Sequence, residues 1–202
     1  MAVNKRAEMM EETRAKLIAA GRKAFAEKGF AGAIMDDFTA EAGLTRGALY
    51  HNFGDKRGLL AAVVDEIDSA MAAEAHEAGQ RAGGGWPGLL AEGAAYIEMA
   101  LQPDVQRIVL LDGPSVLGDP SQWPSQNRCL QATMATLREL AEQGLVKPVD
   151  MEAMARLLNG AALNAALWVA ASADPQATLG KALAAFECLA SGVLAKQGAC
   201  AE

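Results

Sequence analysis

The residues best suited to bind a partner lie between Arg46 and Lys56, where two cationic side chains, a phenol, an imidazole and an amide occur close together. Donors of these types bind phosphate oxygens and the edges of nucleotide bases. Gly47 and Ala48 belong with them, because small side chains let the backbone approach phosphates closely. The candidate residues for DNA are therefore Arg46, Gly47, Ala48, Tyr50, His51, Asn52 and Lys56.

No arrangement typical of catalysis or metal binding is found in the sequence. Gly113–Gly118 has the serine and glycines of a nucleophile elbow, but the spacing is wrong by one residue and no histidine follows. Neither His51 nor His76 lies at a metal-ligand spacing from other ligands. An odd number of widely separated cysteines favours reduced thiols over disulfides; they are Cys129, Cys188 and Cys200. We expect no enzymatic activity, no metal and no cofactor.

A second set of residues, in the C-terminal part of the chain, could bind a small molecule. Large side chains usually fill a core, but Asp112, Thr133 and Asn164 lie on or beside apolar stripes, and buried polar groups need partners or a ligand. Only Arg107 and Arg128 are basic between residues 82 and 137, so we expect a neutral or cationic, largely hydrophobic effector. The candidate lining residues are Trp86, Tyr96, Met99, Asp112, Trp123, Met134, Asn164 and Trp168.

A helix-turn-helix is expected to position the first set. Residues 35–41 can form a short helix with Phe38 inward, and Gly43 offers a tight turn. Thr45 can cap a second short helix that carries Leu49. Such a helix can enter a DNA major groove with its first residues facing base edges.

Composition and spacing predict an all-α chain. Only seven prolines and 5% aromatic residues occur, and β-branched runs bounded by turns are missing. We expect a DNA-binding domain at residues 1–57, beginning with a disordered or frayed polar arm over residues 1–12, and an effector-binding and dimerisation domain at residues 58–202. Other expected segments are helices 13–28, 56–81, 86–101, 105–112, 130–144, 150–171 and 175–197, a break at Gly113-Pro114 and a mobile loop 115–124.

The last two expected helices are apolar on more than one side. Gly160, Ala161 and Ala165 are small enough to let a partner helix approach closely. We therefore expect a homodimer through residues 150–197, built as a two-fold four-helix interface.

Charge is divided unevenly along the chain. Residues 1–58 carry a net charge of +2 and the remainder −9, giving −7 overall. The positive end therefore coincides with the expected helix-turn-helix. The longest apolar run, 160–171, is too short to span a membrane and the N-terminus lacks a signal-peptide core, so we expect a cytoplasmic protein without membrane contact.

The stretch AEAGLTRGALYHNFGDKRGLL from Ala40 to Leu60, preceded by Phe25 and Gly29-Phe30, resembles the TetR family of one-component transcriptional regulators. The resemblance covers roughly residues 13–60, and LLDGPSVLGDP resembles a segment of some of the family's effector domains. It implies an N-terminal helix-turn-helix domain followed by a larger helical domain. It also implies that Tyr50 and Lys56 contact phosphate.

Two departures from the family pattern lie at the start of the motif. Ala33 and Ile34 stand where many relatives have hydroxyl residues that cap the first helix, and Asp36 stands where many have a basic residue.

These features predict a homodimeric regulator, most simply a repressor, that binds a palindromic DNA operator and is released by a small hydrophobic effector. The alternative is a helical small-molecule-binding protein that has lost DNA binding, as Asp36 and the net acidity would allow.

Overall fold

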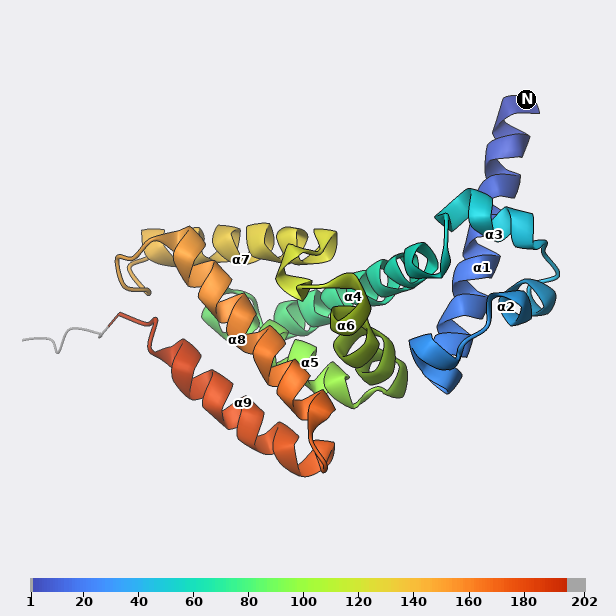
Figure 1. Ribbon diagram of the computed structural model, residues 1–202. Coiled ribbons are helices and arrows are strands. Elements are labelled where there is room, and N and C mark those ends of the chain that lie inside the picture. Colours follow the sequence, from blue (N-terminus) through green and yellow to red (C-terminus); the bar gives the residue numbers. More distant parts are fainter. Residues whose placement is uncertain (1, 196–202) are drawn as a thin grey trace, which may run out of the picture. The chain divides into compact units, whose positions relative to one another are not determined.

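The computed structural model describes residues 2–195, which confirm the all-α prediction (Figure 1). Among these residues the sole β-type pairing is one bridge between Val146 and Leu194. The helices are α1 Ala2–Gly32, α2 Met35–Glu41, α3 Arg46–Phe53, α4 Lys56–Arg81, α5 Gly85–Glu98, the 3-10 turn η1 Met99–Leu101, the π-helix η2 Val105–Asp112, α6 Gly113–Leu117, the 3-10 turn η3 Pro120–Gln122, α7 Pro124–Glu142, α8 Met151–Ala171 and α9 Pro175–Ser191.

The chain forms two compact units, each assembled from segments that are distant in the sequence. The first comprises Met1–Asp68 and Gln102–Pro120, and the second comprises Ser69–Leu101 and Ser121–Glu202. Helix α4 contributes to both units. The first unit therefore contains the helix-turn-helix together with η2 and α6. The domain predicted for residues 1–57 does not contain η2 and α6.

The core of the first unit joins α1, α2, α3 and the start of α4. Phe25, Phe38 and Leu49 are completely buried, and the rings of Phe25 and Phe38 meet edge to face with centroids 5.5 Å apart. Full burial of such a side chain stabilises a fold by about 1.5–3 kcal/mol. Gly21 lets α1 approach α4, because an added Cβ would lie 3.1 Å from Cδ2 of Leu59.

Helices η2 and α6 attach to the same unit through polar contacts. The guanidinium of Arg22 donates its Nε to Asp104 at 3.0 Å, and the backbone N–H of Phe30 donates to the carboxylate of Asp112 at 2.7 Å. Burial alone would raise the pKa of Asp104, but the hydrogen bonds from Arg22 and from the backbone hold it below its usual value. Arg57 also donates its Nε to the carbonyl oxygen of Val116 at 3.1 Å.

In the second unit, α7 and α8 share a core to which α5 also contributes. Leu137, Leu140 and Leu158 are buried there, and Trp86 packs against them. Asp150 and Asp174 cap α8 and α9 by accepting hydrogen bonds from the backbone N–H groups of Ala153 and Ala177. Figure 1 shows α8 and α9 side by side.

The predicted disordered arm at the N-terminus is wrong, because α1 begins at Ala2. No glycine or proline interrupts its first five turns, and the i,i+4 pair between Glu12 and Lys16 stabilises it at 2.7 Å. The hydrogen bond between Glu12 and Lys16 lowers the pKa of Glu12. The predicted stop at Gly29 corresponds to a real kink, since this residue has φ 67°.

Two further predictions differ from the structure in the second half of the chain. The helical path does not break at Gly113-Pro114 but continues as α6, whose first turn accommodates the proline, and η3 lies within the predicted loop. The last helix ends at Ser191 rather than near Gln197, which lies outside the described residues. After Ser191 the backbone pairs with residues 145–147 instead of continuing the helix. The N–H of Lys147 donates to the carbonyl oxygen of Val193, and the N–H of Ala195 donates to that of Leu145, both at 2.9 Å.

Candidate functional site

The α2–α3 motif has the geometry that the sequence predicts. Gly43 adopts φ 64° in the turn, and Thr45 accepts a hydrogen bond from the N–H of Ala48 at 3.2 Å to cap α3. Leu49 is fully buried and anchors α3 to the core. Ile34 precedes α2 without a side-chain cap, so the missing hydroxyl noted in the sequence is not replaced at that position.

The outer face of α3 carries most of the predicted DNA-binding residues. Arg46, Gly47, Tyr50 and His51 are exposed, whereas Ala48, Asn52 and Lys56 are half-buried. These seven residues therefore lie on and immediately after one short helix.

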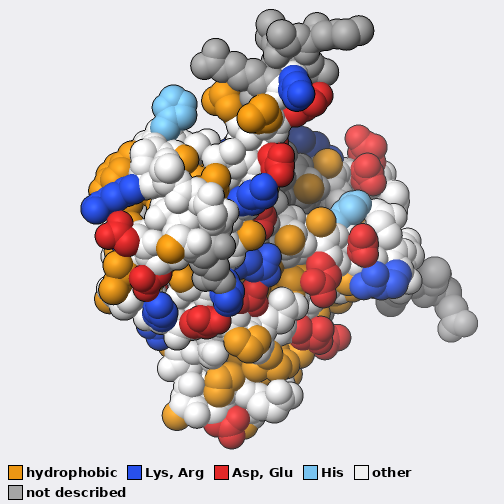
Figure 2. All heavy atoms as spheres, turned by 90° about the vertical axis from the view of Figure 1, so that its right-hand side faces the viewer, with side chains coloured by type: hydrophobic (Ala, Val, Ile, Leu, Met, Phe, Trp, Pro, Cys, Tyr) orange, Lys and Arg blue, Asp and Glu red, His pale blue; other side chains and the backbone are white. Residues whose placement is uncertain are grey.

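Arg46 has intramolecular partners on this face. Its guanidinium lies 3.4 Å from the Tyr50 hydroxyl and 5.6 Å from the centre of that ring, and it forms an ion pair with Asp36 at 3.4 Å. The hydrogen bond with Tyr50 and then the charge of Asp36 raise the pKa of Arg46, so its charge is fixed. The second acid of α2, Asp37, pairs with Lys28 at 3.0 Å. The space-filling view in Figure 2 shows basic and acidic side chains interspersed on the face that it presents.

Two glycines close to each other in the sequence have opposite structural roles. A Cβ added to Gly58 would lie 2.0 Å from the carbonyl oxygen of Phe53, so the corner between α3 and α4 requires glycine. A Cβ added to Gly47 would meet nothing closer than the Thr45 hydroxyl at 3.7 Å. The fold of this unit therefore does not require Gly47 to lack a side chain.

Lys56 and Asn52 are positioned by neighbouring groups. The ammonium of Lys56 lies 4.6 Å from the centre of the Phe30 ring and 3.5 Å from the carbonyl oxygen of Ala31. The amide of Asn52 donates to the carbonyl oxygen of Ala48 at 2.8 Å, so one of its donors is used within α3.

The first turns of α1 add a surface to this region that the site prediction omits. A groove is lined by both helices, with Ala48, His51 and Asn52 on α3 and Lys5, Met9, Met10 and Thr13 on α1. The prediction of a disordered arm obscured this arrangement.

The second unit contains a cavity of about 330 Å³. Five helices line it: α4, α5, α7, α8 and α9. Its walls are mainly apolar, with a smaller number of polar side chains. The lining residues central to the description are Leu89, Leu90, Tyr96, Leu158 and Phe186, together with the polar His76, Glu92, Gln126, Arg128, Thr133 and Asn159.

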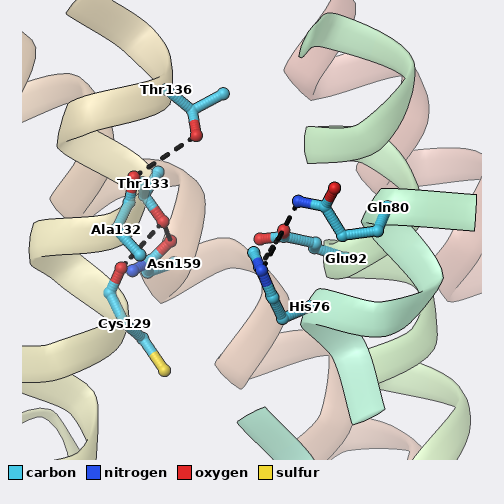
Figure 3. Close-up of polar contacts among 8 residues, drawn as sticks. All are labelled: His76, Gln80, Glu92, Cys129, Ala132, Thr133, Thr136 and Asn159. Carbon is cyan, nitrogen blue, oxygen red and sulfur yellow. Dashed lines mark hydrogen bonds and ion pairs between the residues drawn. The ribbon is translucent and has the colours of Figure 1, made fainter. Parts of the chain in front are cut away.

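Polar groups of the lining form two clusters, which Figure 3 shows on opposite sides of the view. On α4 and α5, Nδ1 of His76 lies 3.1 Å from Oε1 of Glu92, and Gln80 lies 3.4 Å from the other ring nitrogen. Burial raises the pKa of Glu92, and the contact with His76 offsets part of that effect. On α7 and α8, Thr133 lies 2.9 Å from Oδ1 of Asn159, whose Nδ2 is buried without a protein partner.

Of the eight residues predicted to line an effector site, Tyr96 lines this cavity and the other seven do not. Met134 and Trp86 belong to the core between α7 and α8, and Met99 is buried in η1. Asp112 lies in the first unit, where Phe30 and Arg107 satisfy its carboxylate. The remaining three are placed as follows: Trp123 is half-buried at the N-cap of α7, and Asn164 and Trp168 are exposed on α8.

Several lining residues were missed by the sequence reasoning, notably Glu92 and Asn159. Glu92 lies four residues before Tyr96, a spacing that places both on one helical face, and this was the available signal. Asn159 gives no comparable signal, because its neighbour Thr133 comes from another helix.

Two general expectations can be compared with the described part of the chain. It contains no group of three or more His, Cys, Asp or Glu residues arranged to hold a metal ion. None of the helices between residues 2 and 195 has the length and apolar character needed to cross a membrane.

Models of two protein families match the chain. Residues 17–63 match the bacterial regulatory proteins of the tetR family, and residues 86–193 match the tetracyclin repressor-like C-terminal domain. The two matches cover the helix-turn-helix and most of the second unit.

Individual relatives agree with these matches. The HTH-type transcriptional regulator TtgR of Pseudomonas putida is 38% identical over 65 residues, covering 32% of this chain and 31% of that protein. The HTH-type transcriptional repressor AcnR of Corynebacterium glutamicum is 36% identical over 67 residues, 33% of this chain and 36% of that protein. The chain therefore spans about a third of the length of these curated relatives.

A solved structure extends the likeness to nearly the whole chain. A TetR-family transcriptional regulator from Pectobacterium atrosepticum has 48% identity and a TM-score of 0.86, covering 95% of this chain and 98% of that one. Such similarity supports the prediction of a regulator rather than an enzyme. The chain belongs to the TetR family of bacterial transcriptional regulators.

Proposed function

We propose that this chain is a ligand-responsive repressor that binds an inverted-repeat operator as a homodimer. The observation that carries the proposal is the outer face of α3, where exposed Arg46, Tyr50 and His51 surround a glycine that the fold does not require. In this proposal Arg46 contacts a base edge or a phosphate, and Gly47 lets the helix approach the DNA backbone. Tyr50 and Lys56 hold phosphates.

The dimer forms through the outward faces of α8 and α9. Leu157, Trp168 and Leu189 are large apolar side chains with exposed fractions of 69%, 50% and 60%. Leu157, Gly160 and Trp168 lie at helical spacing on one side of α8, and space around Gly160 is open. An apolar face of this kind is suited to a two-fold helix-helix contact, and a dimer that binds successive major grooves must present its two α3 helices about 34–36 Å apart.

The effector binds in the cavity of the second unit and acts through continuous helices. Ala72 and His76 of α4 line the cavity, while Leu59 and Leu60 of the same helix are buried in the core that supports α3. The chain also runs from α5 through η1 directly into η2, whose Asp112 binds the backbone of Phe30. A ligand that favours one arrangement of α4 and η2 therefore changes the population of DNA-competent dimers.

Fluorescence anisotropy with labelled DNA from upstream of the protein's own gene tests this function. We expect binding that exceeds binding to shuffled DNA of the same composition, and a strong loss for Arg46→Ala. Arg81→Ala is the matched control, because Arg81 is an exposed arginine at the far end of α4. Loss of binding in both variants, or equal binding of wild type to both DNAs, would contradict the proposal.

The competing function is a small-molecule-binding protein without DNA binding. The ion pair between Asp36 and Arg46 favours it, because the same guanidinium cannot freely serve a phosphate. A mobility-shift assay distinguishes the two functions: a shift that Asp36→Asn strengthens supports the repressor, and the absence of a shift in both proteins supports the alternative.

A further inference from the structure

We propose that the cavity of the second unit selects a compact organic cation, whose charged nitrogen lies against Glu92 and whose apolar body lies beside Tyr96 and Phe186. The inference rests on the proposed function, since it specifies the chemical class of the effector at that same site.

One face of α5 presents a carboxylate and an aromatic ring to the cavity together. Leu89, Glu92, Gly93 and Tyr96 all line it, and their spacing of three and four residues places them on one side of the helix. The phenol ring therefore follows the carboxylate by one turn. Cations are attracted both to carboxylates and to the faces of aromatic rings.

A second aromatic ring reaches the same part of α5 because Gly93 has no side chain. A Cβ at Gly93 would lie 2.4 Å from Cζ of Phe186, so this ring from α9 packs directly over the α5 backbone next to Glu92. Gly79 on α4 likewise leaves room for the Glu92 side chain, because a Cβ there would lie 2.6 Å from Cγ of Glu92. These two glycines give the carboxylate and the ring their positions.

Glu92 lacks a partner with a fixed positive charge among the described residues. Its ion-pair partner is His76, whose side chain is 62% exposed and whose charge depends on protonation. Burial disfavours an unpaired carboxylate, so a permanently charged ligand nitrogen would relieve that cost. An anionic ligand would instead add repulsion. The fixed cation of the lining, Arg128, is exposed and donates to the Ser69 hydroxyl at 2.7 Å.

The cluster of Thr133 and Asn159 on the opposite side of the cavity offers a contact for a second polar group of the ligand. Thr133 lies against one end of the Asn159 amide, and the other end is buried without a protein partner. Either orientation of the amide leaves one donor or acceptor for a ligand. At about 330 Å³, the cavity is at the lower end of the range of about 300–1,000 Å³ for small-molecule sites, which favours a body of one or two rings.

Calorimetric titration with three probes that share one body tests the proposal: naphthylmethylamine, naphthylmethanol and naphthoate, which are cationic, neutral and anionic at neutral pH. We expect the amine to bind about tenfold more tightly than the alcohol, and the acid to bind most weakly. Glu92→Gln should remove most of the preference for the amine and leave affinity for the alcohol within about twofold. Glu98→Gln is the matched control, because Glu98 is an exposed glutamate on the same helix outside the cavity. It should keep the wild-type preference.

Binding in the cavity is checked by alkylation with N-ethylmaleimide, read by peptide mass spectrometry. The amine should protect Cys129, which lines the cavity, from alkylation. Preference for naphthoate, an unchanged ratio of amine to alcohol in Glu92→Gln, binding without protection of Cys129, or no binding of the amine at about 1 mM would each overturn the proposal.

The same preparations are tested for DNA binding, so the two proposals fail separately. Specific DNA binding without a preference for the amine would refute the cation site and leave the repressor standing. Preference for the amine without DNA binding would refute the repressor and leave the cation site standing.

Discussion

The α3 surface and the cavity of the second unit are built in different ways. The first is contiguous in sequence. Thr45 caps α3 and Leu49 buries its inner side, and together they determine the outer face, which carries Arg46 and Tyr50. The second draws on five helices, and its shape depends on Gly79 and Gly93, positions where missing side chains admit Glu92 and Phe186. A local surface can be altered one residue at a time, whereas the cavity changes whenever a packing contact changes.

The two regions also differ in how their charges are paired. On the α3 surface the fixed charge of Arg46 has intramolecular partners, Asp36 and Tyr50, which DNA would have to displace. In the cavity the half-buried acid Glu92 has a histidine as its partner. Competition from Asp36 and Tyr50 for Arg46 should therefore limit the affinity of the α3 surface for DNA. In the cavity, the negative charge of Glu92 should determine which ligands are selected.

The largest effect is expected where a glycine is required by the fold. Gly58→Ala places a Cβ 2.0 Å from the Phe53 carbonyl oxygen, so it should lower the free energy of unfolding by about 3 kcal/mol. Gly47→Ala should leave stability unchanged or raise it by about 0.5 kcal/mol, yet weaken DNA binding. Urea denaturation and anisotropy measure the two quantities. A Gly47→Ala protein with undiminished DNA affinity would remove the proposed reason for that glycine.

The next effect concerns the competition at Arg46. Arg46→Ala should cost about 1–3 kcal/mol of operator binding if the side chain reads a base. Asp36→Asn should strengthen binding several-fold, because it frees the guanidinium and removes a negative charge near phosphate. Asp37→Asn serves as control, since Asp37 pairs with Lys28 instead. Equal changes for both asparagine variants would point to a general charge effect rather than to the pair.

A smaller effect is expected on stability where η2 joins α1. The carboxylate of Asp104 has a lowered pKa and a 27% exposed side chain, so its pairing with Arg22 should contribute about 1 kcal/mol at neutral pH. Because the folded pKa is depressed, this contribution is present above the unfolded value of about 3.9 and is lost as pH falls through the folded value. Denaturation of wild type and Asp104→Asn at several pH values should show the difference shrinking at acid pH. Glu27→Gln, an exposed site on α1, should show no comparable difference.

The smallest effect is the pH dependence of cation binding in the cavity. Ionised Glu92 is the form that attracts a cation, and burial raises its pKa, so the affinity for naphthylmethylamine should fall as the pH decreases, starting at a higher pH than for a free carboxyl group. The other titratable lining groups are His76 on α4, Tyr96 on α5 and Arg128 and Cys129 on α7. Affinity for naphthylmethanol should stay constant; a parallel loss for the alcohol would indicate a change in the fold instead.

The local features of the fold could be predicted from sequence because short-range signals determine them. Thr45 before α3, Gly43 in the turn, and Asp150 and Asp174 before α8 and α9 act on residues within one helical turn. The α3 surface follows from the same signals, although its binding role stays a prediction. The N-terminus differs from the prediction because i,i+4 pairs such as Glu12–Lys16 stabilise a helix there.

The cavity could not be predicted because its determinants are tertiary. Asp112 lies on an apolar stripe in the sequence, but its carboxylate accepts a hydrogen bond from the backbone N–H of Phe30, a contact between residues far apart in the chain. Aromatic residues such as Trp86 and Trp168 carry no signal for whether they face a cavity, a core or a surface.

The central claim is sequence-specific DNA binding by the α3 surface, and a salt titration of operator affinity tests it most directly. Anisotropy at several salt concentrations, with operator and shuffled DNA, should give a steep linear decrease of log affinity with log salt and a persistent excess for operator. Lys56→Ala should flatten the salt slope, and Arg46→Ala should reduce the excess. Equal affinity of the wild-type protein for both DNAs at every salt concentration would contradict the account.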